Sequence, residues 1–376
     1  MKIAILTLPI ETNYGGILQA FALQNVLEKM GHQALVLDQK KYWTLPLWKK
    51  PLSYCKRGIT KYLLGKDNCI FIEERKNKNY AIISVYTRKF IDKYIQRKIV
   101  DFNRLNELNS DDFDAFIVGS DQIWRPKYFC APIENAFLSF TRGWNVKRIS
   151  YAASFGTDQW EYSSWKTRNC SKLLKAFDAV SVREYSAVAL CKTKFNVDAK
   201  WVLDPTMLLT SLDYQRLLKI KSHSGPQGQL FCYILDKTPI TQKWLEKILD
   251  TKKLLPFEIK VENSASDNVE TQLPVETWID SFINAEYIFT DSFHACVFSI
   301  LFNKPFIVFG NEERGLSRIR SLLACFHLQE RLVTAQNNFD VLDSIPDVLP
   351  GHVKSILEEK RQYSLKFLEH ALKTKT

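Results

Sequence analysis

The stretch Thr290-Asp-Ser-Phe-His-Ala295 decides how the chain is organised. It follows the apolar run 287–289, whose β-branched and aromatic residues are typical of a buried strand. Its Asp-Ser pair can cap a helix over 293–302, and the apolar run 305–309 indicates the next parallel strand. A strand, a tight polar turn and a helix N-terminus form a site for anions, because free backbone N–H groups and the helix dipole point outward there.

His294 falls in the first turn of that predicted helix. An imidazole beside an anion site suits proton transfer, so we predict that His294 carries the chemistry. The competing interpretation is a histidine that only caps a core helix.

The length and composition of the chain favour a folded protein of two domains. A chain of 376 residues is long for one core, and 46% hydrophobic with 25% charged residues excludes a disordered protein. The eight cysteines form no C-x-x-C pair and no Cys/His cluster, so we expect reduced thiols, a cytoplasmic location and no metal. No apolar run approaches the ~20 residues of a membrane span, and the first residues predict a strand rather than a signal peptide.

Positive charge is concentrated in one segment. Residues 40–104 hold 17 of the 52 Lys/Arg and 5 of the 41 Asp/Glu, so the rest of the chain is near neutral with 35 against 36. Trp43, Trp48 and several leucines alternate with lysines there, which suits peripheral contact with an anionic membrane. A solvated basic insertion is the competing interpretation. Nucleic acid would also accept this face, but no base-reading module accompanies it, so we expect none.

The first half alternates predicted strands and helices around a basic helical insertion at 40–110. Between a strand at 2–7 and a helix at 17–27, the turn Asn13-Tyr14-Gly15-Gly16 places two glycines where a ligand or a backbone must come close. The alternative is a tight turn with no further role. Further strands are predicted at 34–37 and within the segments 112–124, 148–156, 178–184 and 201–205, which also contain the turns that follow them.

Polar residues follow the predicted strands at their carboxyl ends, where open α/β sheets bind ligands. Arg183 has a planar guanidinium that suits a carboxylate or phosphate, while an ion pair with Glu184 or contact with a helix end is the alternative. The other residues at such strand ends are Gly119, Ser120, Asp121, Gln122, Ser154 and Gly156.

The second half restarts the alternation and ends in a long amphipathic helix at 352–372. We predict an α/β protein of two Rossmann-like domains facing a cleft, with this helix packing back over the first domain. The expected bounds are 1–205, 206–350 and 351–376. An amphipathic helix is predicted after the central stretch, with the cations Arg314, Arg318 and Arg320 on one side. The alternative, strongest for Arg320, is that this side is only exposed to solvent.

The motifs that are absent narrow the chemistry. The sequence has no Walker loop, no H-E-x-x-H and no nucleophile elbow, so triphosphate hydrolysis, zinc hydrolysis and serine esterase chemistry lack support. Group transfer from a phosphorylated donor remains.

Several motifs in fixed order together resemble the polysaccharide pyruvyl transferase family. The likeness covers nearly the whole chain, and the combination is specific although no single piece is. The motifs are Asn13-Tyr-Gly-Gly-Ile-Leu-Gln-Ala20, Val118-Gly-Ser-Asp-Gln-Ile-Trp124, Tyr151-Ala-Ala-Ser-Phe-Gly156, Ser181-Val-Arg-Glu184, Leu203-Asp-Pro205 and Thr290-Asp-Ser-Phe-His294, with Lys304-Pro-Phe306.

The resemblance implies a glycosyltransferase-B-type (GT-B) fold and transfer of a pyruvate ketal from phosphoenolpyruvate to a sugar. It implies that His294 is the essential histidine and that Arg183 holds the donor. Many members carry arginine where this chain has Ser292, so the donor's charge must also be met by Arg314 or Arg318. Phosphoenolpyruvate is then a co-substrate, and we expect no cofactor.

The acceptor is expected to be a sugar on a lipid-linked oligosaccharide, which would give the basic segment a role at the inner face of the membrane. Asp121 is predicted to orient or deprotonate a sugar hydroxyl. The residues predicted to bind the acceptor are Asn13, Tyr14, Gly15, Gly16, Ser120 and Ser154. A nucleotide-sugar glycosyltransferase of the same architecture, a non-catalytic glycan- or lipid-binding scaffold and an RNA-binding protein are the alternatives.

Overall fold

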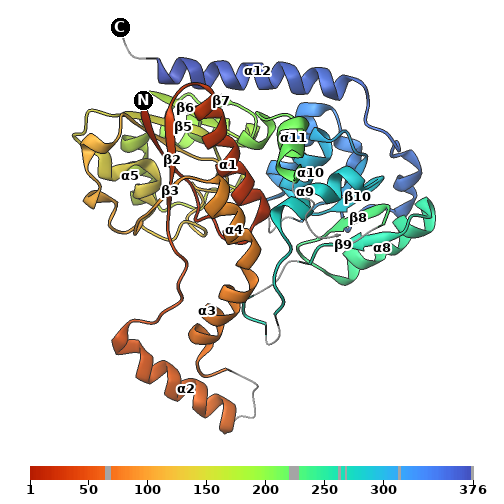
Figure 1. Cartoon of the computed structure of the whole chain (residues 1–376), viewed down its shortest axis with the longest axis horizontal. Helices are drawn as coiled ribbons and strands as arrows, with labels where there is room; N and C mark the ends of the chain where they lie inside the picture. Colours follow the sequence, from red (N-terminus) through yellow and green to blue (C-terminus); the bar gives the residue numbers. More distant parts are fainter. Residues whose placement is uncertain (64–68, 220–227, 261–263, 267–268, 312–314, 374–376) are drawn as a thin grey trace.

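The computed structural model describes residues 1–63, 69–219, 228–260, 264–266, 269–311 and 315–373, which form two α/β halves (Figure 1). Each half is built on one sheet. The first has the strand order β3-β2-β1-β4-β5-β6-β7 and the second β12-β11-β10-β8-β9. The described strands pair in parallel, so the prediction of two Rossmann-like domains is confirmed.

The strands are short and mostly buried, as expected for parallel sheets covered by helices on both faces. The first sheet contains β1 (Lys2–Leu6), β2 (Gln33–Asp38), β3 (Arg97–Ile99), β4 (Ala115–Val118), β5 (Lys147–Ala153), β6 (Ala179–Val182) and β7 (Lys200–Trp201). The second contains β8 (Leu230–Tyr233), β9 (Pro256–Glu258), β10 (Tyr287–Thr290), β11 (Phe306–Phe309) and β12 (Leu332–Val333).

The helices follow the predicted alternation, with some shifted ends. The first begins at Tyr14 rather than Ile17, because the Asn13 side chain accepts a hydrogen bond from the Gly16 N–H and caps it. None of the described helices is long and apolar enough to cross a bilayer. They are α1 (Tyr14–Lys29), α2 (Lys50–Tyr62), α3 (Ile72–Ile83), α4 (Val85–Tyr94), α5 (Ser164–Leu174), α6 (Tyr185–Leu190), α7 (Ser211–Gln215), α8 (Pro239–Lys252), α9 (Val275–Asn284), α10 (Phe293–Leu301), α11 (Leu316–Phe326) and α12 (His352–Leu372).

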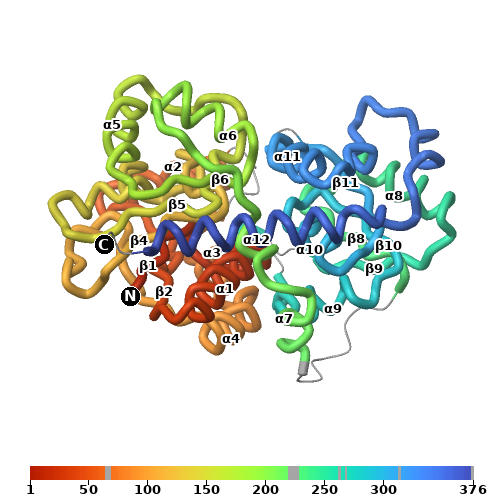
Figure 2. Tube along the Cα trace, turned by 90° about the horizontal axis from the view of Figure 1, so that it is seen from above, coloured from red at the N-terminus to blue at the C-terminus, as the bar shows by residue number. Residues whose placement is uncertain are grey.

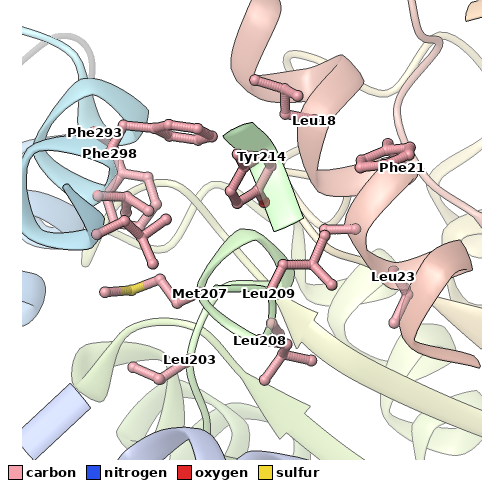
Figure 3. Close-up of a cluster of buried hydrophobic side chains, with 14 of the residues drawn as sticks. Leu18, Phe21, Leu23, Leu203, Met207, Leu208, Leu209, Tyr214, Phe293 and Phe298 are labelled. Atoms are coloured by element: carbon pink, nitrogen blue, oxygen red, sulfur yellow. The ribbon is translucent and has the colours of Figure 1, made fainter. Parts of the chain in front are cut away.

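An apolar core joins the two halves. Tyr214 of α7, in the segment that connects the sheets, packs against Phe298 of α10 with ring centroids 4.9 Å apart. Tyr14 of α1 stacks on Trp278 of α9 at 5.5 Å and donates a hydrogen bond to the Leu273 carbonyl. Figure 3 shows side chains of α1, the connecting segment and α10 meeting in this core. The contacts hold the carboxyl ends of β4 and β6 near that of β10.

Helix α12 runs along both halves (Figure 2). Its Ser364 hydroxyl accepts a hydrogen bond from the Leu203 N–H at 3.0 Å, and its Arg361 donates to the Met207 carbonyl at 2.8 Å. Lys147 of β5 donates to the Ala371 carbonyl at its far end. The prediction that this helix packs back over the first domain is confirmed.

The basic segment divides into an arm and a part of the core. Helix α2 and much of α3 project from the body (Figure 1), whereas Phe90 and Ile91 of α4 are buried. Phe90 packs against Phe21 of α1, and β3 pairs with β2. The predicted insertion at 40–110 was therefore too long at its C-terminal end, because α4 and β3 complete the first domain.

Candidate active site

The turn after β10 is held by hydrogen bonds that set the direction of α10. Ser292 caps the helix by accepting a hydrogen bond from the Ala295 N–H. The Asp291 carboxylate accepts from the backbone N–H groups of Leu235 and Asp236 at 2.7 and 2.9 Å, which ties β10 to the end of β8. The next side chains therefore point toward the first domain from a fixed position.

His294 is buried where the two domains meet. Its side chain is 8% exposed, and its Nε2 lies 3.8 Å from a carboxylate oxygen of Asp204. Within the described part of the chain this Nε2 has no hydrogen-bond partner. On its other side the ring lies against the start of α1, where a Cβ on Gly15 would stand 2.1 Å from Nδ1. The predicted close approach at this glycine is therefore to the catalytic candidate itself.

Asp204 is held by four hydrogen bonds. One of its oxygens accepts from the Arg183 guanidinium at 2.6 Å and from the Ser120 hydroxyl at 2.9 Å. The other accepts from the N–H and the hydroxyl of Thr206 at 3.0 and 2.7 Å. Burial alone would raise the pKa of Asp204, but the His294 ring and Arg183 outweigh it and hold that pKa far below its usual range. Asp204 is therefore a fixed negative charge beside the imidazole.

Arg183 lies between two aspartates. Besides Asp204, it donates to Asp121 at 3.3 Å, and its guanidinium stacks on the Phe293 ring at 4.3 Å. Arg318 approaches the same Asp121 oxygen to 4.0 Å. Burial opposes the charge on Asp121, yet Arg183, His294 and Arg318 together lower its pKa. Asp121 is thus held as a carboxylate among three cationic or titratable groups.

Arg318 is a buried cation of the same cluster. Its pKa is lowered to about 10, first by burial and then by the charge of Arg183. For Arg183 the balance is reversed, because Asp204 and Asp121 overcome the effect of burial and raise its pKa. An anion next to Arg318 would relieve the unfavourable burial of its charge.

Two predicted acceptor-binding hydroxyls face carboxylates inside the protein instead of a cavity. Ser120 donates to Asp204, and Ser154 donates to Glu184 at 2.8 Å. Glu184 is buried and also accepts from the Phe155 N–H; burial raises its pKa. Sequence reasoning placed these serines by their position at strand ends, which does not show which way a side chain turns.

A polar cavity of about 630 Å³ lies at the carboxyl edge of the first sheet. Asn13, Gly16 and Asp121 line it, whereas Tyr14 is buried against Trp278. Asp121 therefore belongs both to the cavity wall and to the cluster around His294. The other lining residues include Glu11, Thr12, Gln19, Gln39, Lys40, Lys41, Tyr42, Trp43, Gln122 and Tyr128.

Several site residues were missed from the sequence. Asp204 belongs to a motif quoted above, but nothing in the sequence shows that it contacts His294. Trp43 and Tyr128 lie beyond the ends of their strands, and only the rule that ligands bind at carboxyl edges could have pointed to them. Arg314 lies outside the described residues. Among the described residues no group of three or more His, Cys, Asp or Glu side chains could hold a metal ion.

Comparison with known proteins identifies the family of this chain and solved structures with a similar fold. The family model for polysaccharide pyruvyl transferase matches residues 13–313. No curated protein matches the sequence significantly.

Two solved structures illustrate the fold. S. aureus TarM in complex with UDP is similar with a TM-score of 0.52 and 10% identity over 99% of this chain and 100% of that one. The UDP-GlcNAc 2-epimerase of Neisseria meningitidis is similar with a TM-score of 0.50 and 10% sequence identity, and the match covers 99% of both chains. At this identity the likeness shows the fold alone, which is the predicted GT-B type.

Proposed function

Because the chain belongs to the polysaccharide pyruvyl transferase family, we propose that it moves the pyruvyl group of phosphoenolpyruvate onto two hydroxyls of one sugar. The product is a pyruvate ketal on a glycan of a capsule, exopolysaccharide or cell wall. The observation that carries the proposal is the contact of His294 with Asp204 within the cluster of Arg183, Asp121 and Arg318.

The donor would bind where Arg318 meets the N-terminus of α10. Phosphoenolpyruvate carries a carboxylate and a phosphate, which favour guanidinium groups and free backbone N–H groups. Arg183 already gives its two terminal nitrogens to Asp204 and Asp121, so its role is to hold these carboxylates and Phe293 in place. Many family members carry an arginine at the position of Ser292. In this chain Arg318 would supply the positive charge that such an arginine provides. This assignment changes the expected role of Arg183 from direct contact to positioning.

His294 would deliver the proton that starts the reaction. Its Nε2 protonates the methylene carbon of the donor, positive charge develops at C2, and a sugar hydroxyl adds there. Phosphate then leaves, a second hydroxyl of the same sugar attacks C2, and the two hydroxyl protons pass to basic groups and solvent. Asp204, fixed by four hydrogen bonds, balances the charge of the protonated ring. Such positioned acid–base catalysis typically contributes about 10²–10⁴-fold.

The acceptor would occupy the cavity next to this cluster. Trp43 and Tyr128 offer aromatic faces, and Asn13 and Gln122 offer polar groups suited to a sugar. Asp121 is an ionised carboxylate at the junction of cavity and cluster, where it can accept a hydrogen bond from the attacking hydroxyl. In this proposal the acceptor is carried on a lipid, and the enzyme works in the cytoplasm at the inner face of the membrane.

Incubation with phosphoenolpyruvate and a panel of lipid-linked and nitrophenyl sugars tests the reaction. We expect release of inorganic phosphate together with a sugar product heavier by one pyruvyl group. Turnover of a nucleotide sugar with release of nucleotide, and none with phosphoenolpyruvate, would instead establish a glycosyltransferase. If wild type and His294→Ala bind the same glycans and neither turns over any substrate of the panel, the protein is a binding scaffold.

A further inference from the structure

Helix α2 lies at the end of the projecting arm (Figure 1). It presents an apolar side to solvent. None of its 13 residues is buried. Its exposed apolar residues recur at spacings of three, four and seven, which places them on one side of the helix, and the turn before it adds two more. This apolar stripe consists of Leu47, Trp48, Leu52, Ile59, Tyr62 and Leu63, each more than half exposed.

The opposite, more polar side of α2 faces the protein. Arg57 donates to both carboxylate oxygens of Glu73 at 2.8 Å and to the Ile70 carbonyl at 3.0 Å. The Tyr54 ring packs against Phe71 with centroids 5.0 Å apart. A surface helix of a globular protein normally does the reverse and buries its apolar side. The arm therefore holds the stripe outward by specific contacts.

The charges around the stripe fit an anionic surface. Four lysines belong to helix α2 and the turn before it, while residues 40–66 contain no Asp or Glu. Lys49 lies over the Trp48 ring at 4.7 Å, which combines a cation with an aromatic residue typical of the membrane interface. The same positive charge disfavours pairing of two copies through this face. Lys49 and Lys56 flank the stripe, whereas the helical period places Lys50 and Lys61 on the opposite side of α2.

We propose that the apolar stripe lies in the headgroup region of a membrane rich in anionic lipid, with the flanking lysines on lipid phosphates. A helix with an outward apolar side and basic flanks binds in the plane of such a membrane without crossing it. Nucleic acid explains the lysines but not the six exposed apolar side chains between them.

The arm also connects the membrane to the active site. It leaves the first domain at the carboxyl end of β2, and residues 40–43, which lead into it, line the cavity next to Asp121. A lipid-linked acceptor resting in the same membrane would thus reach the cavity along the arm. Only this last step rests on the proposed function.

Sedimentation with vesicles tests the inference without any activity. We expect the wild type to sediment with phosphatidylcholine vesicles containing phosphatidylglycerol, less with phosphatidylcholine alone, and less at high salt. The variant Leu52→Ser/Ile59→Ser/Leu63→Ser should lose binding about tenfold or more. The control Leu212→Ser/Leu255→Ser/Val348→Ser changes residues of comparable exposure elsewhere and should bind like the wild type.

Three results would overturn the inference. They are absence of wild-type binding to the anionic vesicles, equal binding by the stripe variant, and salt-dependent retention of RNA without vesicle binding. A dimer that light scattering detects in the wild type but not in the stripe variant, again without vesicle binding, would assign the stripe to self-association. Turnover of a soluble acceptor, measured separately, should be unchanged in the stripe variant. Vesicle binding without turnover by the wild type would count against the proposed reaction and not against the membrane contact.

Discussion

Gly15 and His294 come together across the boundary between the two domains, so closely that any side chain on Gly15 would overlap the imidazole. A Cβ there would stand 2.1 Å from Nδ1 and 2.2 Å from Cγ of the ring. The atoms that would collide lie at the base of the side chain, so the whole ring would have to move. The neighbouring Gly16 differs, since its Cβ would come no nearer than 3.6 Å to Asn13.

The variant Gly15→Ala should displace the imidazole from Asp204 and lower kcat/KM by about a hundredfold or more, because small misplacements of a catalytic group are this costly. Steady-state kinetics with phosphoenolpyruvate measures the loss. Gly58→Ala, in helix α2 away from the site, is the control and should retain most activity, because a Cβ there would come no nearer than 4.0 Å to Ile70. Equal kinetics of both variants would show that the ring position does not matter.

Replacement of the histidine separates chemistry from donor binding. His294→Gln removes the group that delivers the proton but leaves Arg318 and the N-terminus of α10 in place. We expect kcat to fall about 10²–10⁴-fold while calorimetry shows phosphoenolpyruvate binding within a few-fold of the wild type. A variant that keeps its turnover would remove His294 from the reaction.

The strands and helices were predictable because their apolar patterns are local. The run before Thr290 and the one around Ile307 each carry the residues of a buried strand, and the structure has β10 and β11 there. The end of the insertion was not predictable. The segment around Phe90 is rich in lysine and therefore indicates an exposed helix, and the sequence does not show that the Phe90 ring packs against Phe21 of a distant helix.

The active site was predictable only in part. Strand ends pointed to Arg183 and Asp121, but Glu184, the partner named in the alternative interpretation of Arg183, accepts hydrogen bonds from Ser154 and Phe155. The actual partner, Asp204, is 21 residues away in the chain and is brought to Arg183 by the parallel pairing of β6 with β7. Contacts of this kind depend on the tertiary fold, and a single sequence does not display them.

Arg318 is expected to bind the donor through its charge. Arg318→Ala should raise KM for phosphoenolpyruvate about tenfold to a hundredfold, the range for losing a hydrogen bond to a charged group, with a smaller effect on kcat. Arg320→Ala, two residues further along α11 at an exposed position, is the control and should leave KM unchanged. Equal KM values for both variants would assign the donor to another place.

Asp204 should also contribute to stability in a pH-dependent way. Its pKa in the folded protein is far below that of an unfolded aspartate, about 3.9, so its stabilisation is complete above that value and declines as the pH falls toward the folded pKa. Asp204→Asn leaves Arg183 buried without its nearest carboxylate and should lower the free energy of unfolding by about 3 kcal/mol at pH 7. Denaturant unfolding should show this difference constant from about pH 7 to 5 and smaller below about pH 4.

The matched control for this measurement is Asp198→Asn. Asp198 pairs with Lys192 in solvent, its side chain being 85% exposed, so its removal should change stability little at any of these pH values. A difference between wild type and Asp204→Asn that stays the same at low pH would mean that the carboxylate charge is not what stabilises the site. The hydrogen bonds with Ser120 or Thr206 that asparagine cannot accept would then account for the difference.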